Sequence, residues 1–239
     1  MIPYKDENPT VLTPIVTVGL ILVNVLAWLF VQGAGSRGAL AASVCQLGMI
    51  PAELFRTVSP GTTVPLGPGI ACVLDTPHYA TVLTSMFMHG GWFHIIGNMW
   101  FLWVFGNNIE DSMGHARFAV FYLLCGVVAA GTQLLADPHS RVPMVGASGA
   151  VSGVMGAYIV LYPRVRVHTL VTLGFFVTTV ALPAYVMLGY WLLLQLLLGT
   201  VSRTTGGIAV WAHVGGFIAG LVLIKLFVNR QMAERHRGG

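Results

Sequence analysis

The hydrophobic positions of the chain gather into long unbroken runs rather than into an alternating pattern. A helix needs roughly 20 mostly apolar residues to cross a bilayer. Four runs have that character, and they cover 11–32, 116–136, 145–163 and 207–228. The second part of 81–106 adds another apolar stretch of similar length. The pattern therefore predicts a membrane-spanning helix in each of these five places.

Residues 164–201 are too long for one span and awkwardly short for two. Pro183 divides this segment, because proline lacks the N–H that a continuous helix needs. The leucine-rich second half, 184–200, has the length of a span, whereas the first half, 165–182, is rich in β-branched residues. We predict that only the second half crosses, and that 165–182 lies along or dips into the cytoplasmic face. The expected fold is an all-α, polytopic bundle of six transmembrane helices.

Polar segments separate the apolar runs. A long connection covers 33–78, a short polar turn covers 106–115, and a loop covers 137–143. The chain shows no low-complexity tract and no internal repeat.

The domain organisation follows from this pattern. We expect a short cytoplasmic segment over 1–10, one membrane-embedded domain over 11–228, and a basic cytoplasmic tail over 229–239.

The composition supports the bilayer as the solvent of this chain. Of its 239 residues, 56% are hydrophobic and only 8% are charged, and the mean hydropathy is +0.79. A soluble domain carries about 25% charged residues, so this chain cannot cover a water-facing surface. The formal net charge of +4 is small, and we expect no nucleic-acid partner.

The distribution of basic residues predicts the orientation. Six crossings place both termini and the turns at 106–115 and 164–168 on one side. That side carries eight basic residues and the other side four. The first set is Lys5, Arg117, Arg164, Arg166, Lys225, Arg230, Arg235 and Arg237, and the second is Arg37, Arg56, Arg141 and Arg203. By the positive-inside rule, we expect a multi-pass protein of a bacterial plasma membrane with both termini cytoplasmic.

The chain has three cysteines. Cys45 and Cys72 share the 33–78 connection on the predicted outer side, where a disulfide is chemically permitted. Two free thiols are equally compatible with the sequence. Cys125 lies within a predicted span, where we expect a small packing residue.

The polar residues of the spans indicate which chemistry is available. All eight acidic residues fall outside the predicted spans, so the carboxylate relay of an ion-coupled transporter has no obvious members. The spans instead contain Ser148, His213, and the pair His94 and Asn98, which share one helix face at a spacing of four.

Small residues line the two helices that carry Ser148 and His213. Gly149, Gly153 and Gly156 follow Ser148, while Gly216 and Gly220 follow His213 at spacings of three and four. Such stripes let helix backbones approach closely, which brings a short serine side chain within reach of an imidazole. The alternative is that the glycines serve packing alone and that the serine and histidine are incidental.

The combination fits nucleophilic catalysis. A serine hydroxyl needs a base to accept its proton as it attacks a carbonyl, and the neutral imidazole of His213 is suited to this. With no buried carboxylate to orient the histidine, the expected arrangement is a dyad. Asn98, His94 and the backbone N–H of Ser148 are candidate donors to the developing oxyanion.

These motifs resemble those of the rhomboid family of intramembrane serine proteases. "HIIGN" at 94–98 resembles the family's His-x-x-x-Asn motif, "GASG" at 146–149 its Gly-x-Ser-Gly motif, and "AHVGGFIAG" at 212–220 its last-helix motif. His89 matches a further family histidine. The resemblance implies cleavage of transmembrane helices of other membrane proteins near the outer membrane surface, with no metal and no cofactor. It leaves the oligomeric state open.

Two positions depart from the family pattern. The Trp-Arg pair that many members carry in the first loop is absent from 79–85, and Ser152 stands where some members place an aromatic against the catalytic histidine. An alternative reading is a catalytically inactive relative that binds and routes membrane proteins. A metallopeptidase is disfavoured, because the chain has no His-Glu-x-x-His sequence.

Overall fold

The computed structural model describes residues 1–67, 70–173, 176–201 and 209–234. Of the basic residues that entered the charge count, Arg203, Arg235 and Arg237 lie outside this part.

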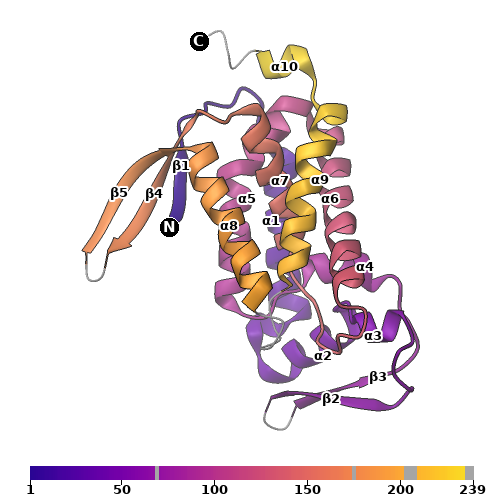
Figure 1. Cartoon of the computed structure of the whole chain (residues 1–239). Coiled ribbons are helices and arrows are strands. Elements are labelled where there is room, and N and C mark those ends of the chain that lie inside the picture. Colours follow the sequence, from indigo (N-terminus) through magenta and orange to yellow (C-terminus); the bar gives the residue numbers. More distant parts are fainter. Residues whose placement is uncertain (68–69, 174–175, 202–208, 235–239) are drawn as a thin grey trace.

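Long helices packed side by side form the body of the molecule (Figure 1). They are α1 (Ile15–Leu26, extended by the π-helical η1, Ala27–Val31), α5 (Trp92–Met113), α6 (His115–Ala136), α7 (Ser148–Leu161), α8 (Ala184–Val201) and α9 (Val210–Phe227). A short helix, α10 (Arg230–Glu234), follows α9. The predicted helical bundle is therefore present.

The connection between α1 and α5 folds against one end of the bundle, at the bottom of Figure 1. It contains η2 (Gly33–Gly35), α2 (Arg37–Leu47), α3 (Pro51–Leu54), β2 (Thr62–Gly67), β3 (Ile70–Leu74), α4 (Thr81–Thr84) and η3 (Ser85–Phe87). Strands β2 and β3 pair as an antiparallel hairpin. A disulfide between Cys45 of α2 and Cys72 of β3 ties this hairpin to the helix, while Cys125 is free and buried.

A three-stranded sheet beside the bundle, at the upper left of Figure 1, corrects the all-α expectation. Strand β4 (Arg166–Leu173) pairs antiparallel with β5 (Phe176–Pro183) on one side and with the N-terminal strand β1 (Ile2–Asp6) on the other. The segment 165–182 thus forms a hairpin and no helix, because its β-branched residues favour extended backbone. Helix α8 begins at Ala184, directly after Pro183.

The prediction of a polar turn over 106–115 is wrong. Helix α5 continues to Met113, and Gly114, with φ +84°, separates it from α6. Glu110 and Asp111 lie inside α5 and are buried, although the sequence placed every carboxylate outside the predicted spans.

Both carboxylates stay in the helix because they have partners at the start of α1. Glu110 accepts hydrogen bonds from the backbone N–H groups of Val16 and Thr17, at 2.9 and 2.7 Å. Asp111 accepts hydrogen bonds from the N–H groups of Val11 and Leu12, at 2.7 and 3.0 Å, in the segment just before α1. The first N–H groups of a helix have no acceptor within it, so Glu110 satisfies donors that would otherwise be unpaired, while Asp111 holds the segment that leads into α1.

Two helices, α6 and α9, are long and apolar enough to cross a membrane. The segments Ile15–Val31, Ser148–Leu161 and Ala184–Gly199 are apolar helices of shorter length. The structure therefore establishes a mostly helical bundle, but it does not establish the count of six spans.

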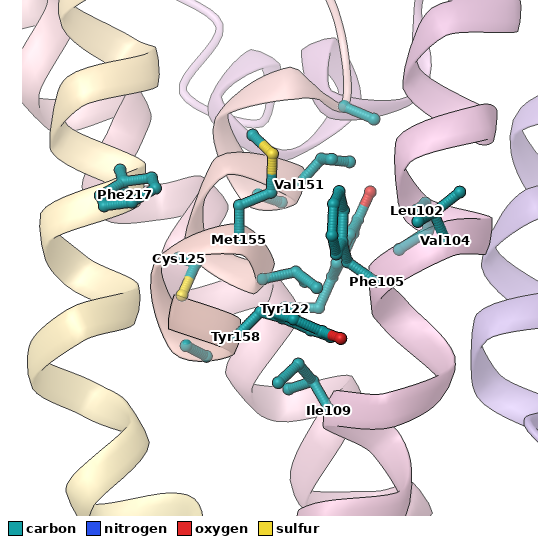
Figure 2. Packing of buried hydrophobic residues seen from close by; sticks show 14 of the residues in the cluster. Leu102, Val104, Phe105, Ile109, Tyr122, Cys125, Val151, Met155, Tyr158 and Phe217 are labelled. Carbon is teal, nitrogen blue, oxygen red and sulfur yellow. The ribbon is translucent and has the colours of Figure 1, made fainter. Parts of the chain in front are cut away.

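Helix α7 occupies the centre of the core. Figure 2 shows side chains of α5, α6 and α9 converging on it. Phe105 of α5 meets Tyr158 of α7 edge to face, with ring centroids 5.0 Å apart, and Tyr122 of α6 is fully buried nearby. This packing fixes α7 from several sides, and with it Ser148 at the start of the helix.

Candidate active site

Ser148 is the first residue of α7, at the end of the bundle against which α2 and α3 fold. The first hydrogen bond of the helix joins the N–H of Val151 to the carbonyl of Ala147 at 3.0 Å. The N–H groups of Ser148 and Gly149 therefore have no partner within α7. They are available to an acceptor beside the serine hydroxyl.

Gly146 shapes the entry to α7. Its φ of +125° lies in a region that other residues rarely adopt, and its N–H donates to the carbonyl of Ser85 at 2.9 Å. A Cβ at this position would lie 2.6 Å from Nε2 of His94. Glycine is therefore needed here for both backbone conformation and space.

His213 of α9 faces Ser148. Its Nε2 lies 2.8 Å from the serine Oγ, within hydrogen-bond distance. Both side chains are half-buried. The structure thus brings the candidate nucleophile and base together, although 65 positions separate them in the chain.

The two glycine stripes allow this contact. A Cβ on Gly216 would overlap the carbonyl group of Gly149, and a Cβ on Gly220 would overlap that of Gly153. Helices α7 and α9 therefore touch backbone to backbone over two turns, which leaves the serine and histidine side chains to span the remaining gap.

A residue that the sequence analysis did not single out completes the histidine's surroundings. Gln195 of α8 places its Oε1 2.8 Å from Nδ1 of His213. Trp191, one helical turn earlier, lies with its ring centroid 6.0 Å from that of His213. The available signal was an isolated amide in "LLLQLLL", 192–198, where an apolar helix has no other use for one.

Ser152 occupies the position at which some members of the resembled family carry an aromatic residue, and it makes a different contact. Its Oγ donates to the carbonyl of Ser148 within α7 at 2.6 Å. The aromatic neighbour of His213 therefore comes from α8, through Trp191, and not from α7.

His94 and Asn98 take different places relative to the dyad. His94 lies on the wall of a cavity that also contains Ser148 and His213, and its Nδ1 accepts a hydrogen bond from the N–H of Gly90 at 3.2 Å. Asn98, one turn further along α5, is buried, and among the described residues its Nδ2 has no hydrogen-bond partner. Asn98 does not line that cavity.

His89 packs against the ring of His94. Its ring is fully buried and meets that of His94 edge to face, with centroids 5.2 Å apart. Gln32 holds the His89 backbone at both ends: its Nε2 donates to the carbonyl and its Oε1 accepts from the N–H, each at 2.8 Å. The histidine that matches the family motif therefore packs behind the cavity wall.

The cavity has a volume of about 770 Å³. Besides Ser148, His213 and His94, its lining includes Gln133, Trp211 and Leu66. Leu66 comes from the β2–β3 hairpin, so the disulfide-linked connection contributes one wall. The cavity therefore lies directly beside the Ser148 hydroxyl and the His213 imidazole.

Curated proteins similar to this chain include several with rhomboid names. Rhomboid-like protein 11, chloroplastic, of Arabidopsis thaliana is 28% identical over 63% of this chain and 53% of its own length. RHOMBOID-like protein 12, mitochondrial, of the same plant is 32% identical over 57% of this chain and 43% of its own length. Rhomboid protease GluP of Bacillus subtilis (strain 168) is 28% identical over 58% of this chain and 24% of its own length.

In each of these relatives, the aligned part spans less than two thirds of the protein. Because two are organellar plant proteins by name, the comparisons do not support the expected bacterial plasma membrane. A family model described as the rhomboid domain matches residues 76–230, well over half of the chain. The chain therefore belongs to the rhomboid family, whose members are integral membrane proteins.

Proposed function

We propose that this chain is an intramembrane serine endopeptidase in which Ser148 is the nucleophile and His213 the base. The observation that carries the proposal is the 2.8 Å contact between Ser148 Oγ and His213 Nε2 on the wall of a cavity. A nucleophile within hydrogen-bond distance of its base is the arrangement that serine hydrolysis requires. Similarity to Rhomboid protease GluP adds support at the level of the family.

The mechanism follows from that geometry. Ser148 Oγ attacks the scissile carbonyl while its proton passes to Nε2 of His213. When the tetrahedral intermediate collapses, the imidazolium gives this proton to the leaving amine. A water molecule then hydrolyses the acyl-enzyme, again with His213 as the base, and frees the serine.

The oxyanion of the intermediate needs donors already in place. The N–H groups of Ser148 and Gly149 at the start of α7 supply two. His94 is a third candidate, because its ring lines the same cavity. Asn98 is the fourth, because its amide is buried without a partner among the described residues. Asn98 does not line the cavity, so its contribution requires a small movement of α5 or of its own side chain.

We further propose that the bundle spans the membrane six times with both termini on one side. Helices α5, α7 and α9 then enter from the opposite face, which places Ser148 and His213 at similar depth near it. Substrates would be transmembrane segments of other membrane proteins. No metal and no cofactor take part in the proposed steps.

Labelling with a fluorophosphonate probe tests the nucleophile. We expect the purified protein to carry the label on the peptide that contains Ser148, and we expect Ser148→Ala and His213→Ala to carry none. Ser152→Ala is the matched control, since it removes a hydroxyl one turn away that does not contact His213, and it should label normally. A correctly folded wild-type protein that never labels would instead favour an inactive relative that binds membrane proteins.

A further inference from the structure

The imidazole of His213 makes two hydrogen bonds, one at each ring nitrogen. Nε2 of His213 lies 2.8 Å from Ser148 Oγ, and Nδ1 lies 2.8 Å from Oε1 of Gln195. A carboxamide oxygen can only accept a hydrogen bond. With Oε1 turned toward the ring, Nδ1 carries the proton and donates it, which leaves the lone pair of Nε2 facing the serine.

We propose that Gln195 is a positioning residue for His213, which fixes the ring in the tautomer that can accept the serine proton. The proposal rests on the proposed function of the Ser148–His213 pair and adds a third member to it. Gln195 touches no reacting atom itself, and it acts by accepting the Nδ1 proton.

The environment explains why an amide occupies this place. In triads of soluble enzymes a buried aspartate orients the histidine. An ionised carboxylate within an apolar bundle is costly, and α8 is a leucine-rich helix. A glutamine supplies the same acceptor geometry with no charge to bury. Orientation of the histidine is thereby kept, while the electrostatic stabilisation that an aspartate gives to the imidazolium is absent.

Helix α8 provides a second contact that restricts the ring. Trp191 and Gln195 are four residues apart and so share one face of the helix. The Trp191 ring lies 6.0 Å from His213 and stacks at 6.1 Å on Phe217 of α9, with an interplanar angle of 27°. Trp191 thus contacts the imidazole from α8, whereas the Ser152 hydroxyl bonds the Ser148 carbonyl within α7. Tautomer and ring orientation therefore both depend on the packing of α8 against α9.

The test compares two substitutions at position 195 on a transmembrane substrate in detergent. Gln195→Met keeps the side-chain length but removes the acceptor. Since a hydrogen bond to the charged imidazolium is lost, we expect kcat to fall about 10- to 100-fold, with KM changed less than about threefold. Leu193→Met is the control: it lies two residues away on α8 with an exposed side chain, and we expect wild-type kinetics.

Gln195→Glu separates positioning from packing. It keeps an acceptor at the same place, so kcat should recover to within several-fold of wild type. Its carboxylate also favours the protonated imidazolium, so the acidic limb of the kcat/KM profile should move to higher pH. Among the described residues, His94 of α5 acts electrostatically on His213, and it is unchanged in every variant.

The outcomes distinguish this inference from the proposed function. Wild-type kcat and pH profile in both Gln195 variants, with Ser148→Ala inactive, would overturn the positioning role alone. Equal loss in Gln195→Met and Gln195→Glu, at unchanged thermal midpoints, would also overturn it, because the acceptor would then be irrelevant. Cleavage by Ser148→Ala would instead reject the proposed function.

Discussion

Gly220 of α9 lies directly against the backbone carbonyl of Gly153 in α7. No side chain can be placed between these two helices at this level without moving one of them. The same contact one turn nearer the site joins Gly216 to Gly149. The distance between Ser148 and His213 is therefore set by backbone packing as well as by the two side chains themselves.

Gly220→Leu should separate the helices and inactivate the protein. The added side chain overlaps the Gly153 carbonyl, and overpacking of this kind costs about 1–3 kcal/mol of stability. We expect a lower thermal midpoint and at least a tenfold loss of cleavage. Gly19→Leu in α1 is the control, because a Cβ there meets nothing within 4 Å. Full activity in Gly220→Leu would show that the close helix contact does not govern the site.

Asn98→Ala tests the role of the buried amide. Removing an oxyanion donor typically lowers kcat by ~10²–10³, and we expect the lower end or less, because the N–H groups at the start of α7 remain. KM should stay nearly constant. If steady-state kinetics instead show a raised KM at unchanged kcat, Asn98 serves substrate binding and not the transition state.

Reduction of the Cys45–Cys72 disulfide should loosen the connection between α1 and α5. The bond closes a segment with a sequence separation of 27, for which the chain-entropy argument gives roughly 3–4 kcal/mol. We expect Cys72→Ala to lower the thermal midpoint and to increase proteolysis between 55 and 80. Mass spectrometry after alkylation should find no reactive Cys45 or Cys72 before reduction. Two alkylated thiols in the unreduced protein would contradict the bridge.

The stability of the protein should depend on pH through Asp6, the last residue of β1. Its Oδ2 accepts hydrogen bonds from Asn108 Nδ2 at 2.7 Å and from Tyr158 OH at 2.6 Å. Burial raises the pKa of the Asp6 carboxyl from 3.8 to about 6, against the opposing effect of the Tyr158 hydrogen bond. Between these values the folded protein binds more protons than the unfolded chain, so this group's contribution to stability falls as pH rises through the window.

Thermal melts of wild type and Asp6→Asn across this window check the sign. The carboxyl contribution should make wild type lose on the order of 2 kcal/mol relative to the variant between pH 4 and pH 7. Comparison with Asp6→Asn removes the effect of the other titrating groups. An identical pH dependence in the two proteins would mean that Asp6 is not perturbed by burial.

The apolar runs predicted the helices of the bundle well, because length and hydropathy alone mark a helix that the bilayer or a core must surround. They failed where a polar group has a distant partner. The sequence places Glu110 and Asp111 in a polar turn, yet they extend α5 because the start of α1 and the segment just before it supply N–H donors. Such long-range pairing leaves no local signal in the sequence.

The segment 165–182 shows a second limit. Its β-branched residues disfavoured a spanning helix, but the sequence did not show that the segment pairs as a hairpin or that the N-terminal strand β1 adds to it as a third strand. The sequence also left the cysteine pairing open, since only the fold brings Cys45 and Cys72 together.

In the candidate site, the sequence predicted the pairing of Ser148 with His213 but not the residues that surround the histidine. Ser148 and His213 stand out because each lies in a glycine stripe, and the structure places their side chains 2.8 Å apart. Gln195 stands out only as an isolated amide in a leucine-rich helix, and the pattern of that helix does not say which neighbour it faces. Only the packing of α8 brings Gln195 and Trp191 to the histidine.

If Ser148 and His213 act together, each is required for cleavage of a peptide bond within the membrane. The most direct measurement is cleavage of a single-span substrate in proteoliposomes by wild type, Ser148→Ala, His213→Ala and the control Ser152→Ala, all checked for equal thermal midpoints. We expect turnover by wild type and Ser152→Ala, with loss of more than ~10³-fold in the other two, since a serine without its base is a poor nucleophile. Cleavage by Ser148→Ala at a rate comparable to wild type would contradict the account.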